Sequence, residues 1–394
     1  ATAVLDMRLR RLTNLELERL EAEYKKVMEE IARLSGILAD ETVLKTVIEE
    51  EITAIRDTFG DQRRTEIVPD EGELNIEDLI AEEEVVVTLT HHGYIKRLPS
   101  TTYRSQRRGG KGVTAMGTRE EDFVENLFIT TTHHFLLFFT DKGKVYQSKV
   151  YEVPEASRQA RGTNIINLLN ISTREKITAV LAIKDFDDER SLLFATKNGI
   201  VKKTALDQFL NIRKGGIQAI RLNDGDDLIG VRFVDEESNI VLASRGGNAI
   251  RFSSTDVRNM GRVTMGVKGI NLDSDDEVIA MEVANDDADL LVITSNGFGK
   301  RTPIREYRCQ GRGGKGVLVM RRTEKTGPIA GVRMVREGDD VMVITINGII
   351  IRTSVSGISQ MSRTTQGVTI MRMDDGDEVV GLAKVVGTQE EAEI

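Results

Sequence analysis

The sequence predicts a mainly β fold, a propeller-like ring built from six four-stranded units, preceded by an α-helical segment. A glycine that ends a short β-like run recurs six times, at intervals of 48 to 56 residues. A second glycine follows each of these within 17 to 22 residues. A period of about 50 residues is typical of repeat architectures such as propellers. The first glycines are Gly93, Gly143, Gly199, Gly247, Gly297 and Gly348, and the second are Gly112, Gly162, Gly216, Gly269, Gly316 and Gly367.

Each unit is expected to open with a β-hairpin. The dipeptides Lys142-Gly143, Asn198-Gly199 and Asn296-Gly297 lie between two short β-like runs. A tight hairpin turn requires positive φ, which glycine and asparagine adopt at the lowest cost. A further β-like run follows the second glycine, then an acidic loop such as DGDD, and then a final strand. Four short strands per unit, repeated radially, form a ring that leaves only short edges.

The segment before the repeats is predicted to be helical. The run Thr13 to Glu16 has the pattern of a capping box, and Asp40 can cap a second helix. Apolar side chains follow helical spacing, which indicates two helices that pack on each other or on a partner. They are Val27, Ile31, Leu34 and Leu38 in the first helix and Ile48, Ile52, Ile55 and Phe59 in the second. We therefore expect a helical arm at 1–59, a linker at 60–78 and the ring at 79–394.

The charge is divided along the chain. The net charge is −9, but residues 1–84 alone carry −12, so residues 85–394 carry +3. Between the first and second glycines of the six units lie 26 basic and only 5 acidic residues. This segregation predicts one positive rim and one negative surface. A positive rim suits a bent duplex, because phosphate contacts position DNA without reading its sequence. A merely solvated surface would mix the two signs.

Composition limits the other classes of function. A single cysteine, Cys309, gives no disulfide framework and no thiolate cluster for zinc, and it favours the reducing cytoplasm. No apolar run is long enough to span a bilayer, so no membrane partner is expected. The pairs His91-His92 and His133-His134 lack partners at ligand spacing, so we expect no metal site. There is no G-x-x-x-x-G-K-[ST] phosphate loop, and we expect no cofactor in this chain.

One motif carries a family resemblance. The run QRRGGKG, Gln106 to Gly112, resembles the gyrase A box of the C-terminal domains of DNA gyrase A subunits, and the likeness covers essentially the whole chain. A near-copy, QGRGGKG, lies at 310–316. The resemblance implies a six-bladed β-pinwheel that wraps DNA, and a box that contacts DNA and closes the first blade against the sixth. The helices would belong to the coiled-coil arm near the dimer-forming exit gate.

The resemblance also implies partners: duplex DNA, the gyrase B subunit, and a second gyrase A subunit, in a complex of two A and two B subunits. The parent enzyme is an ATP-hydrolysing type II topoisomerase that uses magnesium and ATP elsewhere. Its nucleophile is a tyrosine directly after an arginine, and none of the six tyrosines here follows one, so we expect this chain to be non-catalytic. Two alternative assignments remain: the corresponding domain of topoisomerase IV and a protein-interaction β-propeller.

The expected DNA-binding residues are the box and the basic residues at equivalent places in the other units. They are Gln106, Arg107, Arg108, Gly109, Gly110, Lys111 and Gly112, with Lys96, Arg97, Lys144, Lys149, Arg158, Arg161, Lys202, Lys203, Arg213, Lys214, Arg251, Arg258, Arg262, Lys268, Lys300, Arg301, Arg312 and Lys315.

Overall fold

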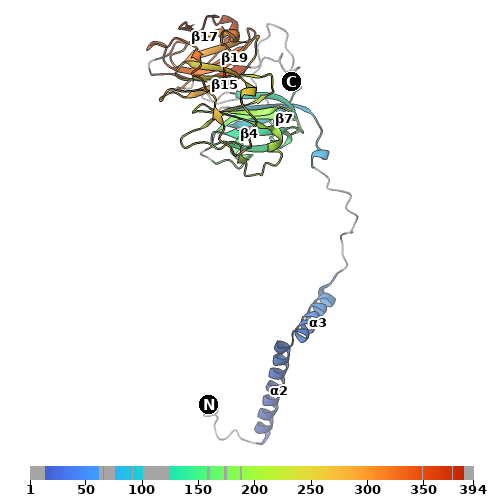
Figure 1. The fold of residues 1–394 in the computed structure, drawn as a ribbon. Helices are drawn as coiled ribbons and strands as arrows, with labels where there is room; N and C mark the ends of the chain where they lie inside the picture. The colour runs from blue at the N-terminus through green and yellow to red at the C-terminus, as the bar shows by residue number, and fades with distance from the viewer. Residues whose placement is uncertain are drawn as a thin grey trace. The chain divides into compact units, whose positions relative to one another are not determined.

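The chain divides into two compact units, residues 1–74 and 75–394. The structure is a computed structural model. It describes residues 14–61, 65, 76–90, 92–100, 124–157, 160–172, 175–186, 189–347, 349–374 and 376–385. Figure 1 shows helices in the first unit and sheets in the second.

The first unit contains two helices, α2 (Asn14–Ala39) and α3 (Glu41–Phe59). Asp40 caps α3 as expected, because its carboxylate accepts a hydrogen bond of 2.8 Å from the backbone N–H of Thr42. The expected cap at Thr13 lies outside the described residues. Neither described helix combines the length and apolarity needed to cross a membrane.

The apolar stripe of both helices is exposed. Leu34 is 46% exposed, Leu38 is 84% exposed and Ile52 is 61% exposed, and α3 has no buried residue. The two helices therefore do not bury this stripe against each other. Of the two expected arrangements, packing of the helices on each other is wrong, and packing on a partner stays a prediction.

The second unit is a propeller of six sheets (Figure 1). Within the described residues, five sheets have four strands and the sixth has three. The first three are β3-β1-β2-β6, β10-β5-β4-β7 and β11-β8-β9-β14, and the others are β15-β12-β13-β18, β19-β16-β17-β22 and β21-β20-β23. The short 3-10 turn η2 (Ile76–Leu79) precedes the first sheet.

The strand bounds follow the repeat. The hairpins are β1 (Glu84–Thr90) and β2 (Tyr94–Pro99), β4 (Phe135–Thr140) and β5 (Lys144–Lys149), β8 (Ser191–Thr196) and β9 (Ile200–Ala205), β12 (Asn239–Ser244) and β13 (Asn248–Ser253), β16 (Asp289–Thr294) and β17 (Phe298–Pro303), and β20 (Asp340–Thr345) and β21 (Ile350–Ser354). The strands that end the units are β3 (Val124–Thr131), β7 (Ile177–Ile183), β11 (Leu228–Val234), β15 (Val278–Ala284), β19 (Ile329–Val335) and β23 (Val379–Val385).

The fourth strand of each complete sheet comes from the next sequence unit. These two-residue strands are β6 (Thr163–Asn164), β10 (Ile217–Gln218), β14 (Val267–Lys268), β18 (Val317–Leu318) and β22 (Val368–Thr369). For example, β18 of the fifth unit pairs with β13 of the fourth. The sequence unit is therefore not the blade, and every blade junction in this part of the chain is tied by backbone hydrogen bonds.

The hairpin glycines have the expected conformation, but the turns are not formed by asparagine. Gly143, Gly199 and Gly297 have φ of 73°, 79° and 77°, whereas no described residue other than glycine has positive φ. The first five hairpin loops have three residues, as in Lys197 to Gly199, and the sixth, between β20 and β21, has four. The N–H of Gly199 donates to the carbonyl of Thr196 at 3.0 Å, so a turn is followed by glycine in the left-handed region.

One expected repeat position is wrong. In the fourth unit the second glycine is Gly266, with φ of 100°, and not Gly269, which does not adopt positive φ. Gly266 immediately precedes the strand β14, just as Gly216 precedes β10 and Gly316 precedes β18. The remnant of the box in this unit is therefore Arg262 to Gly266, and Lys268 lies on the strand that follows it.

The core lies between adjacent blades. Between the second and third blades, Phe139 of β4 packs on Phe194 of β8 in an edge-to-face arrangement, with ring centroids 5.6 Å apart. Equivalent clusters, dominated by valine, leucine and isoleucine, join the other neighbouring blades. Burial of both faces explains why the first strand of each hairpin is a nearly continuous apolar run.

Candidate nucleic-acid interface

In the units that the structure describes, the loop before the second glycine lies against the preceding blade and carries exposed basic side chains. The two-residue strand after the glycine pairs with the previous hairpin, which holds the loop at the blade junction. Arg213, Lys214, Arg258, Lys268, Arg312 and Lys315 are exposed, and Arg161 and Arg262 are half-buried. The structure therefore brings the expected loop residues to successive blade junctions.

An arginine four residues before the second glycine is the recurring member of these loops. Arg262, Arg312 and Arg363 occupy this place in the fourth, fifth and sixth units. The guanidinium of Arg312 donates to the carbonyl of Lys268 at 3.0 Å, and that of Arg363 donates to the carbonyl of Leu318 at 3.0 Å. Both acceptors lie two residues after a second glycine, so the two contacts are equivalent. These hydrogen bonds hold Arg312 and Arg363 at their blade junctions.

Four of the expected lysines on the second hairpin strands are buried. Lys96, Lys202 and Lys300 have no exposed area, and Lys203 is 9% exposed. The amino group of Lys203 donates to the carbonyl of Ser254 at 2.9 Å, and those of the other three also donate to backbone carbonyls. These four side chains join blades in this structure and present no charge to a phosphate.

The expected arginines on these strands are also largely buried. The side chains of Arg97, Arg251 and Arg301 are 19%, 10% and 13% exposed. Arg97 donates to the carbonyl of Val153 at 2.8 Å, and Arg301 donates to that of Ile358 at 2.8 Å. Arg251 donates to the carbonyl of Ile304 at 3.4 Å and pairs with Asp286 at 2.6 Å.

Lys144 and Lys149 in the second unit are paired with carboxylates. Lys144 lies 2.8 Å from Glu175, and Lys149 lies 2.6 Å from Glu77 and over the ring of Phe135. The hydrogen bond that Lys144 donates to Glu175 raises the pKa of Lys144. Paired lysines attract a phosphate less strongly than free ones, because the carboxylate already neutralises the charge.

The whole box, Gln106 to Gly112, and Arg158 lie outside the described residues. Their expected roles stay predictions.

A second row of exposed arginines was not predicted from the sequence. Arg221, Arg321 and Arg372 each lie five residues after a second glycine. The backbone N–H of Arg221 donates to the carbonyl of Thr264 at 3.2 Å, and that of Arg321 donates to Thr365 at 3.1 Å. These carbonyls belong to the basic loops of the next units, so the second row lies beside the first. Counting residues from the second glycine of each unit would have identified this second row from the sequence. The same count would have identified Arg308 and Arg363 in the basic loops.

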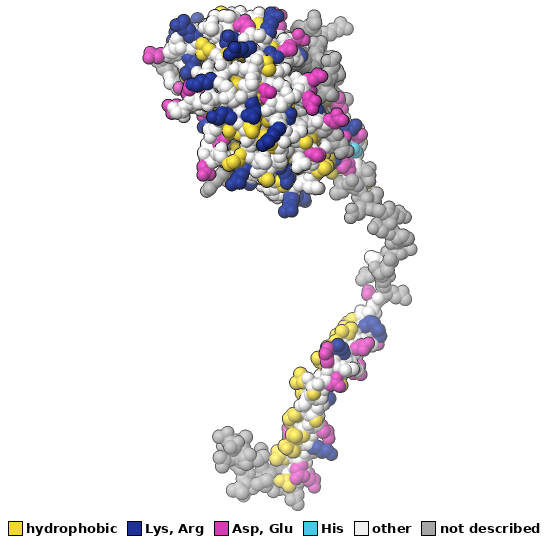
Figure 2. Space-filling view, in the orientation of Figure 1, with side chains coloured by type: hydrophobic (Ala, Val, Ile, Leu, Met, Phe, Trp, Pro, Cys, Tyr) yellow, Lys and Arg dark blue, Asp and Glu magenta, His cyan; other side chains and the backbone are white. Residues whose placement is uncertain are grey.

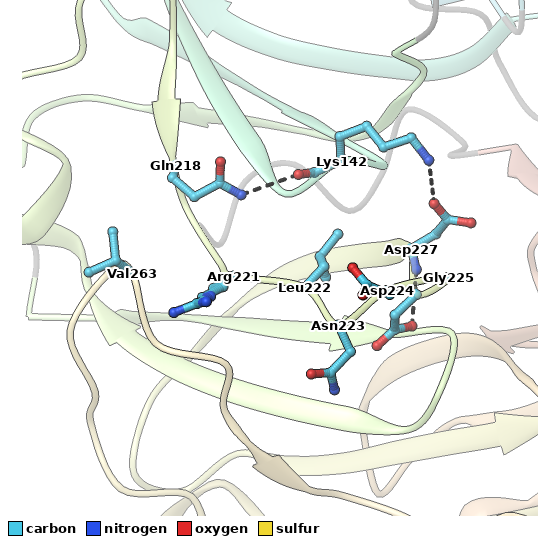
Figure 3. A pocket seen from close by; sticks show the side chains of 10 residues that line it. Lys142, Gln218, Arg221, Leu222, Asn223, Asp224, Gly225, Asp227 and Val263 are labelled. Carbon is cyan, nitrogen blue, oxygen red and sulfur yellow. Dashed lines mark hydrogen bonds and ion pairs between the residues drawn. The ribbon is translucent and has the colours of Figure 1, made fainter.

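Arg221 lines an open groove of about 740 Å³ at one blade junction. Figure 3 shows Arg221 near Val263 of the next unit, with Lys142 bonded to Asp227 at 2.6 Å on the other side. The groove joins three sequence units, because Lys142, Arg221 and Val263 come from the second, third and fourth.

The acidic loops are partly structural. In each of three units one aspartate accepts backbone N–H groups from the hairpin turn, and these are Asp226, Asp276 and Asp377. Asp276 accepts from Gly246 at 2.5 Å, from Glu277 at 2.9 Å and from the hydroxyl of Ser244 at 2.6 Å. On the face in Figure 2, basic side chains cover much of the middle and acidic ones lie mainly toward the edges.

The described histidines are hydrogen-bonded in the fold. His133 lies 2.8 Å from the carbonyl of Ile80, and His134 lies 2.9 Å from the hydroxyl of Thr130. Burial lowers the pKa of His134. Among the described residues, no group of three or more histidine, cysteine or acidic side chains is arranged to hold a metal ion.

Comparison with known proteins identifies the family. The sequence profile of the "DNA gyrase C-terminal domain, beta-propeller" family matches residues 84–131, 134–184, 190–235, 238–285, 288–336 and 339–385. The chain belongs to this family. The six matched segments correspond to the six sequence units, from the first hairpin strand to the strand that ends the unit.

The gyrase assignment extends over the helices as well. The chain is 55% identical over 385 residues to the A subunit of the DNA gyrase of Clostridium acetobutylicum and 51% identical to that of Halalkalibacterium halodurans. Each alignment covers 98% of this chain and 46% of the relative. The chain thus spans about half the length of the curated relatives it matches.

Two solved structures share the fold. A DNA gyrase A C-terminal domain superposes with a TM-score of 0.61 and 28% identity, covering 77% of this chain and all of that one. A topoisomerase IV C-terminal domain gives a TM-score of 0.70 and 27% identity, over 78% of this chain and 94% of that one. The fold is common to both enzymes, and the sequence places this chain with the A subunits of gyrase.

Proposed function

We propose that the propeller of this gyrase A C-terminal domain binds duplex DNA without sequence specificity and bends the duplex along its basic loops. The observation that carries the proposal is the repeated exposure of basic side chains at successive blade junctions, as at Arg213, Arg258 and Arg312. Charged hydrogen bonds to phosphate are strong, and they position a duplex without reading its bases.

The division between exposed loops and buried strands supports bending of the DNA. A bend of 40 to 90° costs of order 1 to 6 kcal/mol, so many modest contacts on a rigid surface are needed. Buried residues such as Lys202 and Arg301 tie each blade to the next and make the surface rigid. Phosphates are then contacted by loop residues such as Arg312, joined by Arg321 and Arg363. Lys315 pairs with Asp273 at 2.9 Å, but both side chains are 69% exposed, so this surface pair can be exchanged for a phosphate.

We extend the proposal to the whole enzyme. DNA wrapped on this domain would be presented to the strand-passage machinery, and ATP-dependent negative supercoiling would follow. The gyrase B subunit would hydrolyse ATP, and a second gyrase A protomer would cover the exposed apolar stripe of α2 and α3. The exposure of Leu34 and Ile52 supports such a partner for the helices.

The box is proposed to complete the sixth blade. In the described residues that sheet has three strands, β21-β20-β23, whereas the five others take a fourth strand from the next unit. The second to sixth units each contribute a two-residue strand to the sheet of the preceding unit, and among the described residues no such strand comes from the first unit. We infer that the box closes the first blade against the sixth and contacts DNA.

A salt titration of duplex binding tests the proposal. For the full chain we expect log K to fall linearly with log salt concentration, with a slope of about −0.9 per contacted phosphate. The variant Arg312→Ala with Lys315→Ala should reduce the magnitude of the slope by about 2. Its matched control is Arg33→Ala with Lys45→Ala on the helices, which removes the same charge and should leave the slope unchanged. Equal slopes for both variants would refute the assignment.

A second experiment addresses the box. Alanine in place of Gln106 to Gly112 should leave folding and most of the DNA affinity intact, because the other loops remain. It should abolish supercoiling by enzyme reconstituted with full-length subunits. Unchanged negative supercoiling would exclude the proposed role of the box.

A further inference from the structure

A position that is buried in the first five units and half-buried in the sixth alternates between lysine and an apolar or aromatic residue around the propeller. It lies three residues after the first glycine of each unit. The first, third and fifth units have Lys96, Lys202 and Lys300 there. The second, fourth and sixth have Tyr146, Ile250 and Ile351. No expected DNA contact explains this alternation, because all three lysines are fully buried.

Each lysine reaches across a blade junction to the basic loop of the next unit. Lys96 donates to the carbonyls of Ser157 and Ala160, both at 3.0 Å. Lys300 donates to the carbonyls of Ser362 and Arg363, both at 2.6 Å.

Lys202 makes the same connection in the third unit. It donates to the carbonyl of Gly261 at 3.3 Å, to that of Arg262 and to that of Ala219. In the fourth and sixth units, one acceptor is therefore the carbonyl of the recurring loop arginine itself.

The loops differ according to the residue beneath them. In the four residues before the second glycine, the loops that receive a lysine are RQAR, RVTM and RTTQ and contain no glycine. The described loops that lie over Tyr146 and Ile250 are IRKG and RGGK. The Tyr146 ring packs under Gly216, the second glycine of that unit, where an added Cβ would lie 2.7 Å from it. Ile250 lies under Gly314, 3.6 Å from an added Cβ, which is an ordinary contact, and an added Cβ on Gly215 would have no neighbour within 4 Å. An apolar side chain thus fills the space under a glycine-containing loop, whereas a lysine binds a loop with larger side chains.

We propose that Lys96, Lys202 and Lys300 are positioning residues that hold the basic loops of the second, fourth and sixth units ready to contact phosphate. A loop fixed before binding loses less conformational entropy when it meets DNA. The inference rests on the proposed DNA-binding function, and it divides the basic loops into two kinds, those bound by a buried lysine and those with glycine among the four residues before the second glycine.

The buried position also affects the charge of the lysines. Burial lowers the pKa of Lys202 to about 7 and that of Lys300 to about 8. Arg262 faces Lys202 and lowers its pKa further, whereas Lys300 faces both Glu306 and Arg363, which oppose each other.

A double-mutant cycle tests the proposal in the full chain, with duplex affinity as the readout. Lys300→Met should weaken binding roughly 3- to 10-fold, the range expected for ordering one long side chain on binding. In the Arg363→Ala background the same change should have little further effect, because Lys300 acts through that loop. The matched control, Ile250→Met, changes the equivalent position of the fourth unit and should not alter affinity.

A compensating variant separates positioning from simple loss of stability. Lys300→Ile combined with Thr364→Gly and Thr365→Gly converts this junction to the glycine-containing kind. Binding should recover to within about twofold of the unmodified chain, the ordinary range for a neutral surface change. If Lys300→Met does not fold, Lys202→Met with Arg262→Ala gives the same cycle at the other junction.

The outcomes are distinct. Additive effects of Lys300→Met and Arg363→Ala, or no recovery in the compensating variant, would overturn the positioning role while leaving DNA binding intact. Absence of salt-dependent binding by the unmodified chain would overturn both proposals. Coupled effects with recovery would establish the positioning role.

Discussion

The variant Gly316→Ala should loosen one blade junction, because two independent features of the structure require glycine there. Gly316 has φ of 75°, and a Cβ at this position would lie 2.4 Å from the carbonyl oxygen of Ala249 in the preceding blade. The left-handed conformation costs an alanine roughly 1–2 kcal/mol, and overpacking costs about 1–3 kcal/mol, giving about 2–5 kcal/mol in total. The oxygen cannot move away freely, because Ala249 pairs with Val317 in the sheet.

Urea denaturation of the full chain measures this loss, with Gly311→Ala as the matched control. Gly311 lies in the same loop, has no positive φ, and has no heavy atom within 4 Å of its Cβ position. Its replacement should change the free energy of unfolding by less than about 0.5 kcal/mol. Equal stability of the two variants would refute the argument that the second glycine is fixed by the approach of the neighbouring blade.

Two further predictions concern buried polar groups. Asp276→Ala should cost about 1–3 kcal/mol of unfolding free energy, because it leaves the N–H of Gly246 without its acceptor. The control, Asp275→Ala, removes an exposed neighbouring carboxylate and should be neutral. Equal effects of the two variants in urea denaturation would contradict the structural role of the acidic loop. Lys202 binds its proton more weakly in the folded state, where its pKa is about 7, than in the unfolded state, where it is 10.5. Below pH 7 the lysine is charged in both states, and burial of the charge lowers the stability by the largest amount. This loss of stability becomes smaller as the pH rises from about 7 to 10.5. The unfolding free energy of the unmodified chain should therefore rise relative to Lys202→Met by up to about 1.4 kcal/mol per pH unit across this window, and a difference independent of pH would contradict the lowered pKa.

The sequence was sufficient for the hairpins and the repeat, because both depend on local constraints. Gly143 and Gly199 stand at turns that only glycine adopts cheaply, so their spacing predicted the units. The exchange of the fourth strand was not predictable from periodicity, since a strand that joins the preceding blade has the same period as one that joins its own. The choice of Gly269 over Gly266 was avoidable from the sequence, because Gly266 lies 19 residues after Gly247, the separation found in four other units, whereas Gly269 lies 22 residues after it. In the structure, Gly266 is the one fixed by close approach to the carbonyl of Val201.

The basic residues show where charge counting is insufficient. Lys202 and Lys203 occur in a run that resembles an exposed strand, yet backbone carbonyls of the next unit accept their hydrogen bonds at a buried junction. Arg312 and Lys315 lie in a glycine-rich loop, where the backbone cannot be buried without partners and the side chains extend into solvent. Exposed Arg221 was missed because it precedes an acidic loop and is not part of the run that contains the box.

The central claim is that DNA bends around the basic loops of the propeller, and the topology of a circular DNA tests it most directly. Relaxed nicked circles are incubated with the full chain, ligated while bound and then freed of protein. The account predicts a shift in linking number that grows with protein concentration and is reduced by Arg312→Ala with Lys315→Ala. An unchanged distribution of topoisomers at protein concentrations that saturate the DNA would contradict it.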